Sequence, residues 1–177
     1  CIGGRDATSN EVLIKKYTEE EDIVFHAKLD GSPFFVIKTK GEEPGEQTKK
    51  ETAQATASYS KAWRMGVAGL DTIYVRPDQL SKQGPSGEYV PKGAFMIRGN
   101  TKKIHAELRI AVGIQSGKNI GGPVDSVKKH AEKCVVLRQG RNKTGEIAKQ
   151  IHNYLGGDLD DIIRFIPPGG CEIDSKL

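Results

Sequence analysis

The first forty residues contain two short hydrophobic runs that are typical of β-strands. IVFHAKL (23–29) and FFVIKT (34–39) are rich in β-branched and aromatic residues, and DGSP (30–33) lies between them. A short stretch of turn-forming residues between two such runs predicts a β-hairpin. Ahead of the hairpin, DATSNE (6–11) supplies N-cap candidates and an acidic first turn for a short helix.

The clearest helical pattern covers residues 47–68. Ala53, Ala57 and Ser60 recur at i, i+4 and i+7, so they form one face of small residues. Such a face lets a helix pack closely on a sheet. Further along, hydrophobic residues alternate with polar ones over 102–114, which predicts one long strand.

The remaining segments complete a mixed fold. Shorter strands are expected at 71–77 and 94–99. From Gly117 onward the pattern predicts a helix opening at 121–123, a strand at 134–137, and helices over 142–157 and 159–168. The sequence therefore predicts an α+β fold, a largely antiparallel sheet with packed helices. We expect residues 1–116 to form the core and 117–177 a C-terminal αβα-like extension packed on it.

The composition restricts the class of protein without fixing its function. A chain of 177 residues that is 36% hydrophobic suits one globular domain. No apolar run approaches the ~18 residues of a membrane span, and the N-terminus lacks a signal-peptide pattern. We therefore expect a cytoplasmic protein with no membrane partner. Since the chain starts at Cys1 and not at Met, we also expect it to be a piece of a longer chain.

Cysteine and histidine spacing gives little support for metal or enzyme chemistry. Three widely spaced cysteines favour reduced thiols over a disulfide framework or a zinc site. None of the four histidines stands in HxxxH or HxxE spacing, and GxSxG, HExxH and phosphate-loop motifs are absent, so we expect no metal and no cofactor. His26 with Asp30 is a candidate acid–base pair, because a carboxylate can orient an imidazole. The alternative is a His26 that is simply hydrogen-bonded near the end of a strand.

Basic residues gather around the loop LSKQGPSGEYVPKGAFMIRG (80–99) and the strand that follows it. Lys and Arg side chains pair with phosphates, hydroxyl and loop N–H groups add hydrogen bonds, and a tyrosine can stack on an unpaired base. A net charge of +4 is compatible with such a partner but does not require one. The candidates here are Ser81, Lys82, Ser86, Tyr89, Lys92, Arg98, Lys102 and Lys103. The alternative is an ordinary solvated basic loop.

Two helix starts add possible anion sites. Arg5 follows two glycines at the entry of the first expected helix, where free N–H groups favour a phosphate. The GGP at 121–123 is a second such start. There Asp125 repels a phosphate, and an ordinary helix entry is the alternative.

Taken in order, four segments resemble the RNA-binding domain of the NFACT family over about residues 1–115. They are IGGRDATSNEVLIKKY, DIVFHAKLDGSPFFVIK, ATASYSKAW and YVRPDQLSKQGPSGEYVPKGAFMIRG. The tail, from GGPVDSVKKH to DDIIRFIPPGGCEI, is similar to the continuation in archaeal-type members. The resemblance implies RNA binding without catalysis by this domain. Full-length members act in ribosome-associated quality control, where they bind the large ribosomal subunit and recruit tRNA, whereas stand-alone versions are linked to RNA modification.

The resemblance also implies which residues matter. The family segments fall on Gly4, Arg5, Asp6, Asn10, His26, Asp30, Ser32, Tyr59, Ser60, Ser81, Lys82, Pro85, Ser86, Gly87, Gly93 and Arg98. Of these we expect Arg5, Lys82 and Arg98, together with Lys102, to contact phosphate. His26, Ser81 and Ser86 would position the loop or contact sugar and base edges. Asp6, Asn10, Ser32 and Gly87 complete the expected RNA-binding set.

The leading hypothesis is a non-catalytic domain that binds tRNA or ribosomal RNA. One rival is an RNA-modifying enzyme, or its accessory subunit, that uses His26 and Asp30 for proton transfer. A third possibility is an adaptor that docks on ribosomal protein through residues 117–177. The sequence leaves the oligomeric state open.

Overall fold

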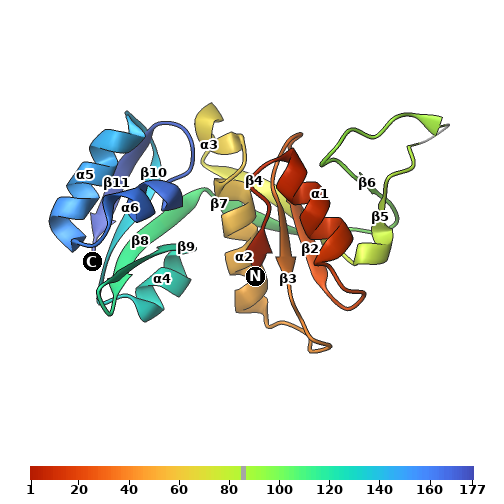
Figure 1. The fold of residues 1–177 in the computed structure, drawn as a ribbon, viewed down its shortest axis with the longest axis horizontal. Helices are drawn as coiled ribbons and strands as arrows, with labels where there is room; N and C mark the ends of the chain where they lie inside the picture. Colours follow the sequence, from red (N-terminus) through yellow and green to blue (C-terminus); the bar gives the residue numbers. More distant parts are fainter. Residues whose placement is uncertain (85–86) are drawn as a thin grey trace.

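The computed structural model describes residues 1–84 and 87–177, and two antiparallel sheets stand next to each other in it (Figure 1). The first sheet has the strand order β1-β3-β2-β4-β7, with bounds Ile2–Gly3, Phe34–Ile37, Ile23–Ala27, Gly69–Val75 and Lys102–Glu107. The second has the order β11-β10-β8-β9, with bounds Cys171–Lys176, Lys133–Asn142, Arg109–Gln115 and Lys118–Gly122. We call residues 1–107 the N-terminal lobe and 109–177 the C-terminal lobe.

Helices cover these sheets, so the expected α+β class with antiparallel pairing is confirmed. They are α1 (Ala7–Lys16), α2 (Glu46–Ser58), α3 (Ala62–Met65), α4 (Val124–His130), α5 (Thr144–Leu155) and α6 (Leu159–Phe165), with a 3-10 turn, η1 (Pro77–Gln79). A small ribbon of β5 (Leu80–Ser81) and β6 (Met96–Ile97) closes the base of the loop between β4 and β7.

The predicted N-cap of the first helix is present, but the predicted acidic first turn is not, because α1 begins at Ala7 and Glu11 lies beyond its first turn. Asp6 caps α1, because its carboxylate accepts a hydrogen bond from the Ser9 N–H at 2.8 Å, and the Ser9 hydroxyl accepts one from the Asp6 N–H at 2.8 Å. The expected hairpin is also confirmed. In it β2 and β3 pair antiparallel, and His26 lies opposite Phe34.

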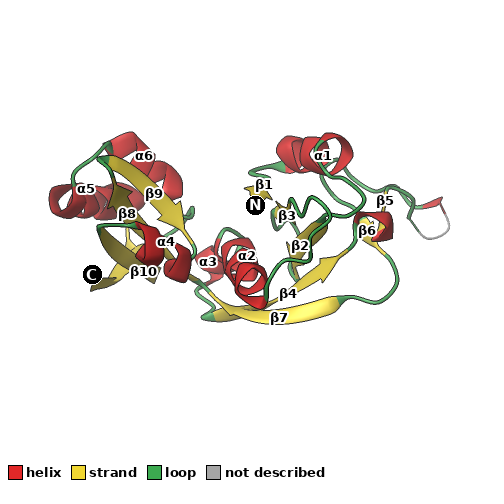
Figure 2. Cartoon of the chain, turned by 90° about the horizontal axis from the view of Figure 1, so that it is seen from below, coloured by secondary structure: helices red, strands yellow, loops and turns green. Residues whose placement is uncertain are grey.

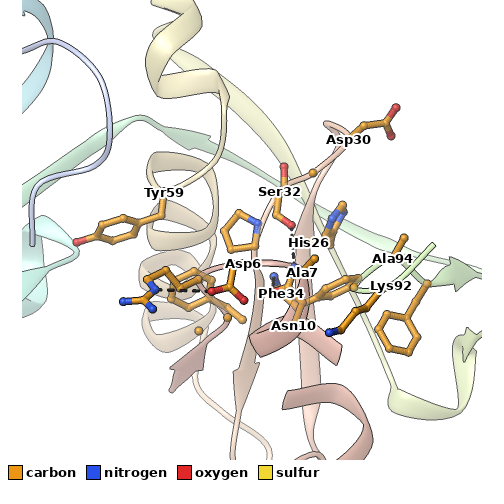
Figure 3. Close-up of a pocket in the computed structure, with 18 of the residues that line it drawn as sticks. Asp6, Ala7, Asn10, His26, Asp30, Ser32, Phe34, Tyr59, Lys92 and Ala94 are labelled. Atoms are coloured by element: carbon orange, nitrogen blue, oxygen red, sulfur yellow. Dashed lines mark hydrogen bonds and ion pairs between the residues drawn. The ribbon is translucent and has the colours of Figure 1, made fainter. Parts of the chain in front are cut away.

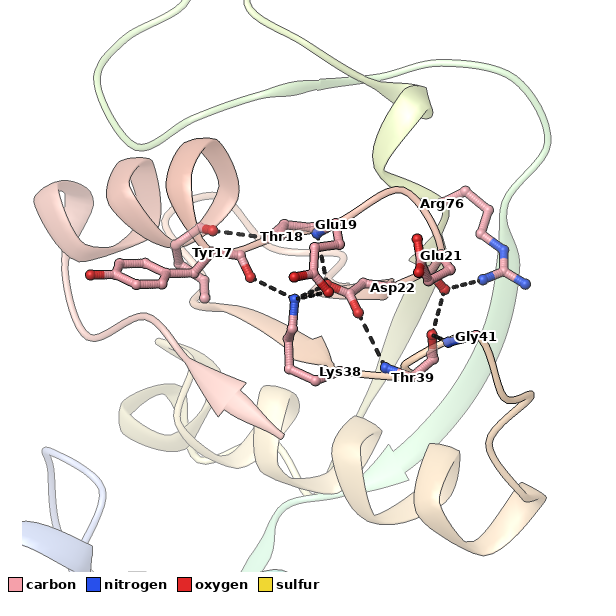
Figure 4. A network of polar contacts seen from close by, with 10 residues as sticks. Tyr17, Thr18, Glu19, Glu21, Asp22, Lys38, Thr39, Gly41 and Arg76 are labelled. Carbon is pink, nitrogen blue, oxygen red and sulfur yellow. Dashed lines mark hydrogen bonds and ion pairs between the residues drawn. The ribbon is translucent and has the colours of Figure 1, made fainter.

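A polar network joins the end of α1 to the end of β3 (Figure 4). The buried Asp22 carboxylate accepts hydrogen bonds from the N–H groups of Glu19 at 2.8 Å and Thr39 at 3.1 Å, and it pairs with Lys38. Lys38 also donates to the Tyr17 carbonyl at 2.9 Å. Burial alone would raise the pKa of Asp22, but these hydrogen bonds hold it below its usual value.

The long helix expected over 47–68 is interrupted. Ala53 and Ala57 are fully buried on the inner face of α2, as their spacing predicts. The helix then ends at Ser58, and the Ser60 hydroxyl donates to the Ala57 carbonyl at 2.6 Å and accepts from the Ala62 N–H at 3.1 Å. This local hydrogen bonding competes with the helical pattern, and the chain turns before the short helix α3 begins.

The single strand expected over 102–114 is divided into two strands that belong to different sheets, β7 and β8. β7 pairs with β4 in the first sheet, whereas β8 pairs with β9 and β10 in the second. The buried Leu108 stands between them, and its N–H donates to the Ala68 carbonyl at 2.9 Å. Figure 2 shows β7 along the bottom of the molecule and β8 in the other lobe, beside β9 and β10. Sheet membership thus changes at Leu108, and the division of the chain at residue 117 stays a prediction.

The C-terminal lobe holds more strand than its sequence indicates. α4, α5 and α6 lie near the expected positions, but β9 takes up the two glycines at 121–122, and Pro123 is the N-cap of α4. β11 was not expected and pairs with β10. The three cysteine thiols are free, with Cys1 exposed and the other two buried.

The two lobes share a hydrophobic core. One cluster of buried side chains includes Trp63 and Ala106 from the first lobe and Ile110, Ile151 and Ile162 from the second. This common core fixes the lobes against each other through packing. No helix within the described residues is both long enough and apolar enough to span a bilayer.

Candidate nucleic-acid interface

A groove of about 1050 Å³ lies where the two lobes meet (Figure 3). Segments that are far apart in the sequence form it: the entry of α1, the turn between β2 and β3, the loop before β6, Tyr59, and the end of α6. Its lining residues are Gly3–Ala7, Asn10, His26, Asp30–Phe35, Tyr59, Pro91–Phe95, Arg164, Ile166 and Pro168. The structure therefore brings together Arg5, Asp6, Asn10, His26 and Ser32 from the predicted set.

Three of these predicted residues shape the groove through contacts inside the chain. The buried Asn10 amide accepts a hydrogen bond from the Phe34 N–H at 3.2 Å and donates to the Ser32 carbonyl at 3.5 Å. The Ser32 hydroxyl donates to the Leu29 carbonyl at 2.6 Å. Asp6 caps α1. These contacts fix the hairpin turn against α1, so the role of these residues as RNA contacts stays a prediction.

Glu11 anchors the loop 80–99 to α1. Its carboxylate accepts hydrogen bonds from Lys15 at 2.5 Å, from Lys82 at 2.8 Å and from the Gly93 N–H at 2.8 Å. Burial opposes ionisation, but these partners outweigh it and lower the pKa of Glu11 to about 2. The sequence indicated only an acidic first turn here, because nothing local to Glu11 reveals partners that lie in a distant loop.

Lys82 points inward, which was not expected. Its ammonium group donates to Glu11, to the Pro91 carbonyl at 2.8 Å and to the Ala94 carbonyl at 2.9 Å, and it lies 4.6 Å from the centre of the Phe95 ring. An ammonium group has three hydrogens to donate, and all three have acceptors within the chain. Its expected role as a phosphate contact stays a prediction, and its hydrogen bonds hold the loop 80–99 to α1.

Arg5 and Lys92 place exposed cationic groups at the groove. The Arg5 side chain is 94% exposed, and its ion pair with Asp6, at 3.8 Å, is long and exposed. Lys92 is also exposed and lines the same groove (Figure 3). Exposed ion pairs contribute little, so Arg5 can exchange its carboxylate for a phosphate at small cost.

His26 lines the groove beside Phe34. Its ring lies 4.5 Å from the buried Phe34 ring and is half-buried. Burial lowers the pKa of His26 against the smaller opposing effects of the Ser32 backbone and the Asp30 charge, so the imidazole is neutral at pH 7. Asp30 is exposed at the outer end of the turn, with its carboxylate directed away from the ring (Figure 3). Within the described residues no hydrogen bond joins the two, so the arrangement lacks the oriented pair that proton transfer needs.

Ser81, Gly87, Arg98 and Lys102 are not among the residues that line this groove. The Ser81 hydroxyl accepts from the Gln83 N–H at 3.0 Å, and the exposed Arg98 donates to the Gln83 carbonyl at 2.9 Å. Lys102 lies on β7, 5.9 Å from the Tyr74 ring centre. Gly87 is exposed on the loop, and Ser86 falls outside the described residues.

Sequence reasoning missed Arg164. This residue lies in the last turn of α6 and lines the groove from the C-terminal lobe. The signal that marks it is an arginine near the end of a short helix that stops at two prolines, a place from which a long side chain reaches a neighbouring surface.

Comparisons with known proteins confirm the resemblance to the NFACT family. Residues 1–99 match the family described as NFACT protein RNA binding domain. The chain is 42% identical over 99% of its length to the archaeal Rqc2 homolog aRqcH of Methanocaldococcus jannaschii, of which it covers 27%. It is 42% identical over 55% of its length to the ribosome quality control complex subunit NEMF homolog of Drosophila melanogaster, covering 10% of it. It is 38% identical to ribosome quality control complex subunit 2 of Schizosaccharomyces pombe, over 55% of this chain and 10% of that protein.

A solved structure is also similar to part of the chain. The C-terminal region of the fibronectin/fibrinogen-binding protein of Streptococcus suis matches with a TM-score of 0.49 and 23% identity, over 59% of this chain and 39% of that one. The curated relatives are all much longer than this chain, which spans about a quarter of the archaeal protein.

Proposed function

Because the chain belongs to the family of NFACT protein RNA-binding domains, we propose that it binds RNA in the groove between its two lobes. The observation that carries this proposal is the convergence of predicted residues from separate family segments on one surface. Arg5, His26 and Lys92 all line it. Arg5 and Lys92 supply phosphate contacts, and the half-buried aromatic rings that line the groove supply stacking surface.

The RNA that fits the relatives' names is one found at the ribosome. Those relatives are named as ribosome quality control proteins, and this chain matches only a part of each. We propose tRNA as the bound RNA, with the large ribosomal subunit as the place of action and the cytoplasm as the compartment. Neither proton transfer by His26 and Asp30 nor docking through residues 117–177 gains a specific observation in its favour.

A titration of labelled tRNA with the purified chain tests the RNA site. The double variant Arg5→Glu with Lys92→Glu reverses both groove charges, and Lys129→Glu with Lys149→Glu makes the same charge change on exposed positions of α4 and α5. We expect the groove variant to bind at least about ten-fold more weakly and its control to stay near the parent. The slope of log affinity against log salt concentration should also fall by about 1.4 for two lost phosphate contacts.

Three outcomes of this titration would contradict part or all of the proposal. If the parent chain does not bind tRNA even at low salt, the proposed function is wrong. If both double variants weaken binding equally, only net charge attracts the RNA and the groove is not its site. A homopolymer competitor that displaces tRNA completely would leave RNA binding in place but remove tRNA as the preferred ligand.

A further inference from the structure

The groove is not built by the N-terminal lobe alone. Arg164, Ile166 and Pro168 line it from the C-terminal lobe, outside residues 1–99 that match the family. In Figure 2 α6 and α1 both lie in the upper part of the view, whereas β7 runs along the bottom. One wall of the candidate RNA site therefore belongs to a lobe to which no RNA role has been assigned.

That wall is held rigidly in place. The Tyr59 hydroxyl donates to the Phe165 carbonyl at 2.7 Å, and the Trp63 indole N–H donates to the Gly170 carbonyl at 3.1 Å. Between these two hydrogen bonds Ile166 is buried, with 5% of its surface exposed, and it packs into the shared core. A wall fixed in advance loses little conformational entropy when a ligand binds.

Arg164 is the charged group that this wall presents. Its side chain is 76% exposed and pairs with Asp161, one turn earlier in the same helix, at 3.2 Å. Such an exposed pair contributes little to stability, so a phosphate can replace the carboxylate. Arg5 across the groove, Lys92 and Arg164 together give cations on more than one side of the same space.

The floor of the groove is largely aromatic. Phe35, Tyr59 and Phe95 are half-buried, and His26 lies on the Phe34 ring. The Phe95 ring meets Phe34 edge-on at 5.6 Å. An A-form duplex presents phosphates and sugars to a protein and keeps its base faces stacked inside, whereas an unpaired strand offers its base faces to aromatic side chains.

From these features we propose that the groove holds an unpaired stretch of RNA between the two lobes. Its phosphates contact Arg5, Lys92 and Arg164, and its bases lie against the aromatic floor. This inference rests on the proposed RNA binding and adds two things to it: the single-stranded form of the bound segment, and a phosphate contact from the C-terminal lobe.

A charge reversal at Arg164 tests the contribution of the second lobe. Arg164→Glu should weaken binding of a labelled single-stranded RNA oligonucleotide at least about ten-fold, while Arg164→Lys keeps most of the affinity, since it keeps the charge. Lys149→Glu on the outer helix α5 is the matched control and should bind like the parent. Thermal unfolding of each variant checks that Arg164→Glu leaves the fold intact, as expected for an exposed side chain.

A competition experiment tests whether the bound RNA is single-stranded. An unlabelled single strand should displace the labelled one at a concentration at least about ten-fold lower than a blunt duplex of the same sequence. His26→Ala, which removes a stacking surface, should weaken single-strand binding at least about five-fold.

The possible negative results separate the unpaired-strand inference, the contact from the second lobe and RNA binding itself. Equal affinity for duplex and single strand overturns the unpaired-strand inference. If Arg164→Glu binds like Lys149→Glu while Arg5→Glu with Lys92→Glu binds weakly, the second lobe takes no part and the proposed RNA site of the first lobe stands. Absence of any RNA binding by the parent chain would instead refute the proposed function itself.

Discussion

The carboxylate of Glu11 lies between two segments that are far apart in the sequence. It holds Lys82 and the Gly93 N–H of the loop 80–99 against α1, and its side chain is only 15% exposed. Glu11→Gln removes the charge and keeps the shape. We expect this variant to lower the free energy of unfolding by about 1–3 kcal/mol, because the Lys82 ammonium loses its charged partner.

Urea denaturation followed by circular dichroism measures this loss. Glu20→Gln, at an exposed position of the same segment, is the control and should change the free energy of unfolding by less than about 0.5 kcal/mol. Equal effects of the two variants would show that Glu11 does not anchor the loop.

The pH dependence of stability follows from the same carboxylate. The pKa of Glu11 is about 2 in the folded chain and 4.5 when unperturbed, so its ionised form favours folding. That contribution is complete above pH 4.5 and is lost as the pH falls from 4.5 towards 2. The lowered pKa of Asp22 acts in the same direction. Denaturant midpoints measured across this range should fall for the parent and fall less steeply for Glu11→Gln.

The sequence predicted which residues could bind a phosphate better than it predicted which way their side chains point. Arg5 and His26 lie on the groove as expected, because a helix entry and a hairpin strand fix their positions locally. Lys82 turns inward because Glu11 and two loop carbonyls accept its hydrogens, and such partners are known only once the loop has folded. Arg164 was missed for the opposite reason, since its place in the groove depends on how the two lobes pack.

At the scale of elements, the loop 80–99 depends on close approach to α1. Gly93 has a φ of +77°, and a Cβ there would lie 2.5 Å from the Ala7 Cα. Gly87 has a similar φ of +80°, but a Cβ there would meet nothing within 4 Å. Both substitutions with alanine carry the left-handed backbone cost, and only Gly93→Ala adds the steric clash.

We therefore expect Gly93→Ala to destabilise the chain by about 1–3 kcal/mol more than Gly87→Ala in urea denaturation. Because the loop supplies one side of the groove, Gly93→Ala should also weaken RNA binding. If the two alanine variants unfold at the same urea concentration, the loop does not depend on its contact with Ala7.

Helices and turns were predicted correctly where a few adjacent residues determine them. The turn at 30–33 and the Asp6 cap are encoded in a few adjacent residues, and both are present. The helix 47–68 and the strand 102–114 were predicted as continuous because periodicity extends across Ser60 and Leu108. Hydrogen bonds of the Ser60 side chain interrupt the helix, and the strand is divided because its two halves pair in different sheets. The hydrophobic periodicity of the sequence shows neither effect.

At the scale of the whole molecule, the shared core couples the lobes. Trp63, the single tryptophan of the chain, is buried in the cluster that both lobes build. We expect one cooperative unfolding transition, with Trp63 fluorescence and far-ultraviolet circular dichroism giving the same midpoint.

Val136→Ala sharpens this test, since Val136 is fully buried in a separate cluster of the C-terminal lobe. The substitution should destabilise the chain by roughly 1–3 kcal/mol and shift the Trp63 midpoint as much as the circular dichroism midpoint. A Trp63 transition that stays at the parental midpoint would mean that the lobes unfold independently.

The path from β7 through Leu108 into β8 has a consequence for how such a domain changes over evolutionary time. β7 is the edge strand of its sheet, so a chain that continues past it attaches new structure without re-pairing any older strand. The family match ends at residue 99, just before β7 begins. A lineage that gains or loses a second lobe at this junction keeps the pairing of the older strands, but it must also change the side chains that now form the core shared by the two lobes.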